Sequence, residues 1–426
     1  FFNDDTITIT GGITKTSGEC VNIVGKNGII TTLHNLSNRT VDDLENELVG
    51  FRQERPMAVI LPSLFSELEG PALKNIIQKL SFVPYLEEII IGLDRANEQE
   101  YRFALQFFSK LSQKTSILWN DGPAMQTIHK KLDKHGLAPK QAGKGRNVWY
   151  CMGYVLAGTK AEAIALHDCD ITTYERDLLA RLIYPVANPN FNYEFCKGYY
   201  ARTAEGKLNG RVSRLLVSPL IRALKKICGE LDYLQYMGSF RYPLAGEFSF
   251  RRDVLYDIRI PSDWGLEIGV LSEMHRNYSL NRLCQVDIAD TYDHKHQDLS
   301  AENDKSGLSK MSIDIAKSLF RKLATQGVTF NNENFRTLKA TYFRIALDHI
   351  DAYHNDAAIN KLSFDIHNEE KAVELFAENI IKAGETFLEK PMETPFIPAW
   401  NRVQSAIPDI FDEICHAVEH DRAKYS

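Results

Sequence analysis

The 426-residue sequence predicts an α/β protein in which a largely parallel sheet is flanked by a short β-rich segment and a helical segment. Three patterns support this fold class. Short, almost wholly apolar runs recur between residues 56 and 170, helical periodicity separates them, and two of the runs end in an aspartate. Apolar strands that alternate with helices are typical of a parallel sheet covered on both faces. Ligands of such sheets bind beyond the carboxyl ends of the strands.

The first 55 residues predict a small β-rich prefix. Residues 6–10 alternate with a period of two before a pair of glycines breaks the pattern. Residues 21–24 and 28–32 have the composition of two further short strands. We therefore expect the main α/β domain to begin near residue 56.

The next segment predicts four buried strands, near 57–62, 87–94, 116–119 and 161–166. A helix follows the first strand, and another, near 98–111, follows the second. The second strand ends at Asp94 and the fourth runs into Asp168. Both carboxylates are therefore expected at the ligand-binding edge of the sheet. Residues 171–300 are expected to hold helices and polar loops, and residues 301–426 to be mainly helical.

The composition excludes several classes of function. A formal net charge of −6 argues against a general nucleic-acid binder, which carries a basic excess. No apolar run reaches the ~18 residues of a membrane span, and the first residues lack the pattern of a signal peptide. The seven cysteines show no Cys-x-x-Cys spacing, which fits a reducing compartment. We therefore expect a cytoplasmic protein without a disulfide framework or a zinc site.

An acidic pair, Asp168 and Asp170, follows the fourth predicted strand. Two carboxylates that leave a buried strand together can point into one cleft. Mg²⁺ and Mn²⁺ prefer oxygen ligands and need few protein carboxylates when phosphates supply the rest. The pair therefore suits a cation that neutralises a diphosphate leaving group. Alternatively, it caps a helix or lies in a solvated loop.

Several other polar residues lie in unusual surroundings. Lys144 lies between two glycines that permit close backbone approach, although the spacing of a P-loop is absent. Glu247 and Glu267 lie among apolar residues and glycines, where a carboxylate needs a partner. Arg211 follows a glycine and precedes a serine two residues later, which suits an anionic group. Alternatively, Lys144 is a solvated surface lysine, the two glutamates are paired with backbone amides or an arginine, and Arg211 lies at a solvated helix start.

Two histidines, His294 and His296, alternate in a polar segment, so they share a face if the segment is extended. Histidine is a common metal ligand and proton carrier. A pair of this kind otherwise belongs to the polar surface.

Taken together and in this order, the motifs resemble those of the retaining glucosyl-3-phosphoglycerate synthases and their mannosyl-3-phosphoglycerate relatives. The resemblance covers about residues 56–325. The matching stretches are the proline-containing donor loop at 61–69, the G-K-G-x-x-x-W element at 143–149, the acidic motif at 168–170, the K-x-x-Y-x-R element at 197–202, the acceptor loop at 210–213, the P-L-x-G-E and G-x-E-I-G blocks at 243–247 and 265–269, and His294. Four positions depart from the family pattern: Cys169, Ser213, Tyr292 and His296.

The resemblance implies a GT-A fold, the Rossmann-like fold of nucleotide-diphospho-sugar transferases. It divides residues 56–300 into a nucleotide-binding half (56–170) and an acceptor-binding half (171–300). The implied donor is UDP-glucose, or alternatively a GDP-sugar, and the implied cofactor is Mg²⁺ or Mn²⁺. The implied acceptor is a small anion such as 3-phosphoglycerate. A homodimer through the helical region at 301–426 follows by the same analogy.

The resemblance also implies roles for individual residues. The metal ligands would be Asp170 and His294. The donor-binding residues would be Pro62, Leu64, Glu67, Asp94, Lys144, Asp168 and Cys169. The acceptor-binding residues would be Gly210, Arg211, Val212, Ser213 and His296. The residues expected to act directly in catalysis would be Lys144, Arg211 and Glu267.

The expected reaction is front-face displacement with an oxocarbenium-like transition state, in which the protein positions the substrates and stabilises leaving-group charge. Three alternatives stay open. One is an inverting transferase of the same fold with Glu267 or Asp293 as base, and another is a sugar-nucleotide-binding protein without turnover. The third, a nucleotidyltransferase, would need a glycine-rich signature near Leu61 that the sequence lacks.

Overall fold

The computed structural model describes residues 25–36, 39–294, 307–391 and 396–426. Within these residues, nine strands form one mixed sheet, in the order β1-β2-β11-β7-β10-β6-β3-β4-β5. The strands are β1 (Gly25–Asn27), β2 (Ile30–Leu33), β3 (Met57–Leu64), β4 (Leu86–Asp94), β5 (Lys114–Trp119), β6 (Ala163–Leu166), β7 (Phe195–Tyr200), β10 (Phe248–Arg251) and β11 (Leu283–Ala289). A small hairpin of β8 (Thr203–Ala204) and β9 (Lys207–Leu208) lies apart from it.

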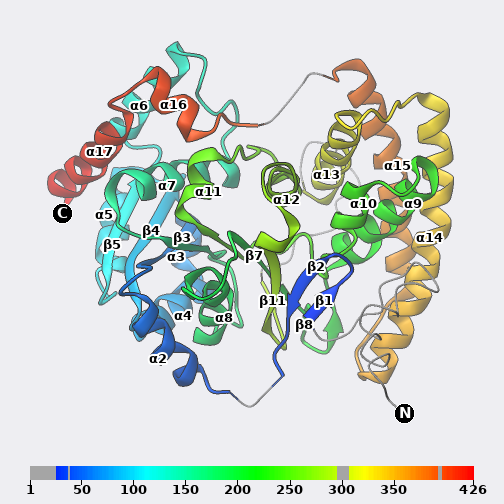
Figure 1. Cartoon of the computed structure of the whole chain (residues 1–426), viewed down its shortest axis with the longest axis horizontal. Coiled ribbons are helices and arrows are strands. Elements are labelled where there is room, and N and C mark those ends of the chain that lie inside the picture. Colours follow the sequence, from blue (N-terminus) through cyan, green and yellow to red (C-terminus); the bar gives the residue numbers. More distant parts are fainter. Residues whose placement is uncertain (1–24, 37–38, 295–306, 392–395) are drawn as a thin grey trace.

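Helices cover the sheet and extend beyond it (Figure 1). In the first half of the chain they are α2 (Val41–Phe51), α3 (Phe65–Glu69), α4 (Pro71–Leu80), α5 (Glu98–Phe108), α6 (Pro123–Lys134), α7 (Lys144–Gly158) and α8 (Arg176–Ala187). In the second half they are the π-helical η1 (Val212–Val217), α9 (Ser218–Cys228), α10 (Asp232–Met237), α11 (Arg252–Asp257), α12 (Leu266–Asn277), the 3₁₀ turn η2 (Leu280–Arg282), α13 (Gly307–Ala324), α14 (Asn332–Ile359), α15 (Ile366–Glu389), α16 (Trp400–Ala406) and α17 (Ile410–Tyr425).

The four strands predicted between residues 56 and 170 are confirmed as β3, β4, β5 and β6. They run parallel to one another, with β3 between β4 and β6. Alternate side chains of β3 enter two separate apolar layers, with Ala58 and Ile60 in one and Val59 and Leu61 in the other. Both faces of this part of the sheet are therefore covered, as continuous apolar strands require.

The helices expected in residues 171–300 are confirmed, but the prediction missed β7, β10 and β11, which complete the sheet there. β10 is antiparallel to both β6 and β7, so the sheet is mixed. Lys197 and Gly198 interrupt the apolar pattern of β7, and β10 has only four residues. Neither segment therefore carries a strand signal that stands out from a loop.

The described part of the predicted prefix packs with the rest of the chain. β1 and β2 form an antiparallel hairpin, and β2 pairs in parallel with β11 at the edge of the main sheet. The predicted strands at 6–10 and 21–24 lie outside the described residues. The predicted strand at 28–32 is confirmed in part, because β2 covers residues 30–33 while residues 28–29 form the turn of this hairpin.

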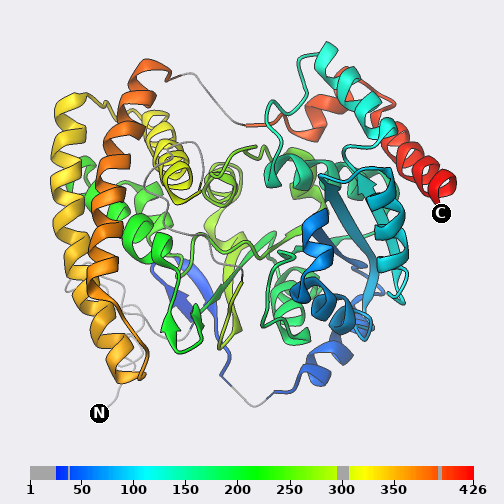
Figure 2. The ribbon, with the colours of Figure 1, turned by 180° about the vertical axis from the view of Figure 1, so that it is seen from behind.

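The C-terminal helices lie in two places (Figures 1 and 2). α13, α14 and α15 pack together beside α9 and η1, whereas α16 and α17 return to α6, α7 and α11 at the opposite end of the molecule. The predicted helical character of this region is confirmed. In the described parts of the chain, no helix combines the length and apolar character needed to cross a bilayer.

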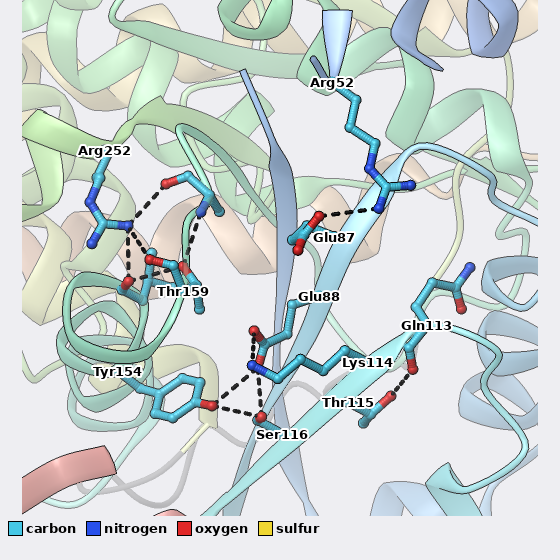
Figure 3. A network of polar contacts seen from close by, with 12 residues as sticks. Arg52, Glu87, Glu88, Gln113, Lys114, Thr115, Ser116, Tyr154, Thr159 and Arg252 are labelled. Carbon is cyan, nitrogen blue, oxygen red and sulfur yellow. Dashed lines mark hydrogen bonds and ion pairs between the residues drawn. The ribbon is translucent and has the colours of Figure 1, made fainter. Parts of the chain in front are cut away.

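A buried polar network fixes α7 against the sheet (Figure 3). The Glu88 carboxylate on β4 is 1% exposed and accepts hydrogen bonds from Ser116 Oγ (2.6 Å) on β5 and from Tyr154 Oη (3.1 Å) on α7. The Lys114 ammonium completes the network at 2.9 Å. Because buried carboxylates need such partners, this network holds the helix whose first residue is Lys144.

Candidate active site

The site begins where β6 leaves the sheet. The backbone N–H of His167 still donates to the carbonyl of Ile60 on β3 (3.1 Å), and Asp168 follows beyond the strand end. The predicted position of the acidic pair at the carboxyl edge of the parallel strands is therefore confirmed. This is the edge at which α/β sheets of this kind bind ligands.

Lys144 lies between two carboxylates from distant elements. Its Nζ is 2.6 Å from Asp168 Oδ1 and 3.2 Å from Glu267 Oε1. Lys144 begins α7, Asp168 follows β6, and Glu267 lies in the first turn of α12. The structure thus brings together three residues that the sequence singled out separately.

The charges of this cluster support one another. Burial opposes the charge on Lys144, but Asp168 and Glu267 raise the pKa of its ammonium group above the usual value. Burial acts to raise the pKa of Asp168, but the Lys144 ammonium holds it below its usual value. Both groups are therefore charged at neutral pH.

Two glycines allow the cluster to form. A Cβ at Gly246 would lie 2.9 Å from both Asp168 Cγ and Lys144 Nζ, closer than ordinary contact. A Cβ at Gly145 would overlap the carbonyl oxygen of Pro261, which packs against the start of α7. Of the two glycines beside Lys144 that were predicted to permit close backbone approach, Gly145 does so, because the backbone of Pro261 packs directly against it.

Asp170 and His294 face each other beside this cluster. Asp170 Oδ2 is 3.8 Å from His294 Nδ1, and the bridge between Ile171 and His294 aligns the two segments. Arg202 Nη2 lies 3.2 Å from His294 Nδ1 and can donate to it. Burial and the charge of Asp168 raise the pKa of Asp170 to about 7.

This pair fits a divalent cation only if substrate supplies further ligands. Within the described residues, no group of three or more His, Cys, Asp or Glu side chains is arranged to hold a metal. Two ligand atoms at right angles on one Mg²⁺ lie about 3 Å apart, so Asp170 Oδ2 and His294 Nδ1, now 3.8 Å apart, would approach each other further on binding it. Mg²⁺ is commonly held by one or two protein groups together with substrate phosphates. The pair therefore suits a cation that arrives with a diphosphate.

Three of the residues predicted to bind the donor, Asp94, Pro62 and Leu64, lie at the ends of β4 and β3. Asp94 Oδ1 accepts a hydrogen bond from Asn120 Nδ2 (2.7 Å) and pairs with Arg146 Nη2 (3.2 Å). Burial raises the pKa of Asp94 despite this arginine. Pro62 and Leu64 are half-buried residues of β3.

The other predicted donor residues lie close to this edge. Glu67 is half-buried on α3, directly after β3. The Cys169 side chain is 4% exposed, and burial raises the pKa of its thiol. Any contact of Cys169 with a donor would therefore come from its backbone.

The predicted acceptor loop has a different set of partners. Gly210 has a φ of +77°, which favours glycine, and Val212 and Ser213 begin the π-helical η1. The Arg211 guanidinium pairs with Glu369 on α15 at 2.8 Å. The structure thus connects this loop to the C-terminal helices. His296 lies outside the described residues.

Sequence reasoning singled out Glu247 but did not predict the buried polar residues that contact it. Glu247 is 0% exposed and accepts hydrogen bonds from Tyr200 Oη (2.9 Å) and Tyr292 Oη (2.6 Å). The two tyrosine rings stack with centroids 3.7 Å apart. Because Tyr292 lies two residues before His294, this network fixes the segment that carries the histidine. The signal in the sequence was a carboxylate among apolar residues, without any indication of its partners.

Lys197 is a second residue whose role sequence reasoning missed. It is fully buried on β7, and burial lowers the pKa of its ammonium group to about 8. Its Nζ donates to the carbonyl of Ala245 at 2.5 Å. Lys197 therefore holds the backbone directly before Gly246, against which the Lys144–Asp168 pair packs.

The fold and the site together define a nucleotide-sugar-dependent glycosyltransferase of the GT-A class. Over 398 residues, the chain is 47% identical to the glucosyl-3-phosphoglycerate synthase of Persephonella marina, covering 93% of this chain and 98% of that enzyme. It is 37% identical over 400 residues to the enzyme of the same name from Methanococcoides burtonii, covering 93% and 97%. The chain belongs to the glucosyl-3-phosphoglycerate synthase family.

Solved structures agree with the fold. Glucosyl-3-phosphoglycerate synthase from Mycobacterium tuberculosis, in a complex with Mn²⁺, UDP-glucose and phosphoglyceric acid, matches with a TM-score of 0.51 at 20% identity. The match covers 71% of this chain and 89% of that one. Mannosyl-3-phosphoglycerate synthase from Rubrobacter xylanophilus matches with a TM-score of 0.50 at 20% identity over 67% and 80% of the two chains. No protein-family model matches the chain.

Proposed function

We propose that the protein transfers glucose from UDP-glucose to 3-phosphoglycerate, with a divalent cation and with retention of the anomeric configuration. One observation carries the proposal. In a chain 47% identical to a glucosyl-3-phosphoglycerate synthase, Lys144 lies between Asp168 and Glu267 at the carboxyl edge of the sheet. Asp170 and His294, beside them, form a pair suited to a diphosphate-bound cation.

The donor would lie across the carboxyl ends of β3, β4 and β6. Asp170 and His294 would hold Mg²⁺ or Mn²⁺, which supplies charge neutralisation for the departing diphosphate. Pro62, Leu64, Glu67 and Asp94 would line the nucleoside end of the site. Asp168 and the backbone of Cys169 would contact the donor nearer its diphosphate.

The protein's own contribution to the reaction is positioning and charge. Lys144 would donate to the donor's phosphate or sugar oxygens, and its place between Asp168 and Glu267 fixes the direction of its ammonium group. Glu267 would accept from sugar hydroxyls or orient the acceptor hydroxyl. In front-face displacement, the acceptor hydroxyl approaches as the diphosphate leaves and gives its proton to a leaving-group oxygen. Fixed charges that need no rearrangement stabilise such a step most strongly.

The acceptor would lie against η1 and the loop before it. Arg211, with the backbone of Gly210 and Val212 and the Ser213 hydroxyl, would bind its phosphate or carboxylate. His296 would add a contact from the segment after His294. Guanidinium groups match the geometry of both anions.

The direct test is an assay with UDP-glucose, 3-phosphoglycerate and Mn²⁺, followed by NMR of the anomeric centre of the product. Asp170→Ala should abolish transfer while its circular dichroism spectrum stays unchanged. Asp133→Ala, at an exposed position on α6, is the control and should keep full activity. Unchanged turnover in Asp170→Ala would overturn the metal site. A β-linked product would indicate an inverting enzyme, and donor binding without transfer or hydrolysis would indicate a binding protein.

We also propose that the enzyme acts in the cytoplasm as a homodimer. The six described cysteines are free, which fits a reducing compartment.

The proposed dimer would use two exposed isoleucines of the C-terminal helices. Ile359 and Ile366, at the adjoining ends of α14 and α15, are 82% and 40% exposed. A contact between copies through these helix ends would cover them. Light scattering after gel filtration tests the dimer, and a monomeric mass at micromolar concentration would contradict it.

A further inference from the structure

Two arginines of the acceptor segment share one buried carboxylate from the C-terminal helices. Glu369, in the first turn of α15, is 4% exposed. Its Oε1 accepts from Arg211 Nε at 2.8 Å and lies 2.8 Å from Arg211 Nη2. Its Oε2 accepts from Arg214 Nη2 at 3.0 Å. One negative charge therefore lies between two positive charges.

The two arginines differ in exposure. The Arg214 side chain is 8% exposed and donates also to the carbonyls of Asn209 and Leu208, so it is a structural member of the group. The Arg211 side chain is 31% exposed. Arginine has five N–H donors in a planar fork. Glu369 occupies the Nε edge of Arg211, which leaves the N–H groups on Nη1 for another anion.

A second unused donor lies beside this arginine. Ser213 is 4% exposed, and within the described residues its Oγ has no hydrogen-bond partner. Buried hydroxyl groups are normally satisfied by protein, water or ligand. Arg211 and Ser213 therefore offer donors from two positions of one segment, separated by Val212, and the charge of the Arg211, Arg214 and Glu369 group is positive overall.

The C-terminal helices hold the backbone of this segment as well. Tyr342 Oη on α14 donates to the carbonyl of Leu215 at 2.5 Å, and His349 Nδ1 lies 3.2 Å from the carbonyl of Arg214. A π-helical turn frequently marks a functional position in a helix. The C-terminal helices therefore hold this segment in two ways. Tyr342 and His349 contact its backbone carbonyls, and Glu369 pairs with the guanidinium groups of Arg211 and Arg214.

We propose that Glu369 is a positioning residue for the acceptor: it fixes the Nε edge of Arg211 so that the opposite edge faces the acceptor's phosphate or carboxylate. This inference rests on the proposed function, in which Arg211 binds that anion. An arginine already held in its binding conformation loses less side-chain freedom when the anion binds. The helical extension would thereby contribute to acceptor affinity without contacting the acceptor through Glu369.

The test measures KM and kcat for 3-phosphoglycerate and KM for UDP-glucose in two variants and a control. Glu369→Gln removes the charge, and Glu369→Asp keeps it but withdraws the carboxylate by one methylene. Losing a charge-assisted contact of this kind should raise KM for 3-phosphoglycerate about tenfold in Glu369→Gln. Glu369→Asp should give a smaller rise, and KM for UDP-glucose should stay within about twofold in both. Glu370→Gln, the exposed neighbour on the same helix turn, should match the wild type.

Loss of stability alone would not imitate this result, because partial unfolding lowers apparent kcat and leaves KM unchanged. If Glu369→Gln does not fold, Glu369→Asp decides, and an unchanged acceptor KM there would overturn the proposal. Equal rises in KM for donor and acceptor would also overturn it.

The variant Arg211→Ala separates this proposal from the proposed function. An unchanged acceptor KM in Arg211→Ala would contradict the acceptor site itself. A raised KM in Arg211→Ala with no change in Glu369→Gln would contradict only the positioning role. If Glu369 acts through Arg211, the double variant should show the same acceptor KM as Arg211→Ala.

Discussion

The replacement Gly246→Ala tests whether the Lys144–Asp168 pair must lie where the structure places it. The new Cβ would be 2.9 Å from Asp168 Cγ and 2.9 Å from Lys144 Nζ, whereas ordinary contacts lie between 3.4 and 4 Å. The Asp168 carboxyl group must therefore move by about 0.5–1 Å. Misplacement of a reacting group by about 1 Å can cost on the order of a hundredfold in rate. We expect kcat/KM for transfer to fall by roughly that factor.

The same change should lower stability only moderately. The atoms that meet the new methyl group are the ends of two side chains, which can move without displacing the backbone. The free energy of unfolding should fall by about 1 kcal/mol, the lower end of the range for overpacking. Steady-state kinetics and urea unfolding measure the two effects separately.

Gly50→Ala is the matched control, because a Cβ at Gly50 on α2 would meet nothing within 4 Å. It should leave kinetics unchanged and keep or slightly raise stability, since alanine favours a helix over glycine. Activity within about twofold of wild type in Gly246→Ala would refute the reasoning that the position of this pair governs transfer.

Two further predictions concern the metal and its support. Because burial and Asp168 raise the pKa of Asp170 to about 7, the proton must leave before the cation binds. The Mn²⁺ concentration for half-maximal activity should therefore fall about tenfold between pH 6 and pH 8, and a flat profile would contradict Asp170 as ligand. Tyr292→Phe leaves Glu247 with one phenolic partner and should lower the free energy of unfolding by about 1–3 kcal/mol while weakening Mn²⁺ activation through His294. Unchanged stability and Mn²⁺ response would show that the Tyr292 hydroxyl supports neither.

The strands at the nucleotide end were predictable because burial on both faces leaves an almost continuous apolar run, as in β3 and β4. β7 was not, since Lys197 and Gly198 lie inside it and its neighbours in the sheet, β10 and β11, come from later in the chain. Lys197 is compatible with a buried strand only because the carbonyl of Ala245 accepts from it. That partner is set by the tertiary fold and leaves no local pattern.

The candidate site shows the same limit. The motifs identified Lys144 and Glu267 individually, but these residues are 123 positions apart, and no local rule predicts that their side chains meet at 3.2 Å. Glu369 was missed entirely because it reads as one of several glutamates on an amphipathic helix. Only its burial against Arg211 and Arg214 distinguishes it.

The two aspartates of the acidic motif are chemically alike in sequence and different in the structure. Lys144 compensates the charge of Asp168 and holds its pKa below the usual range, so a cation would have to compete with an ammonium already 2.6 Å away. Lys144 also lowers the pKa of Asp170, but burial and the charge of Asp168 outweigh it and raise this pKa to about 7, so the charged form of Asp170 gains most from a divalent ion. This difference favours Asp170 as the metal ligand. It leaves Asp168 to orient Lys144, so that one short motif serves both the cation and the fixed charge beside it.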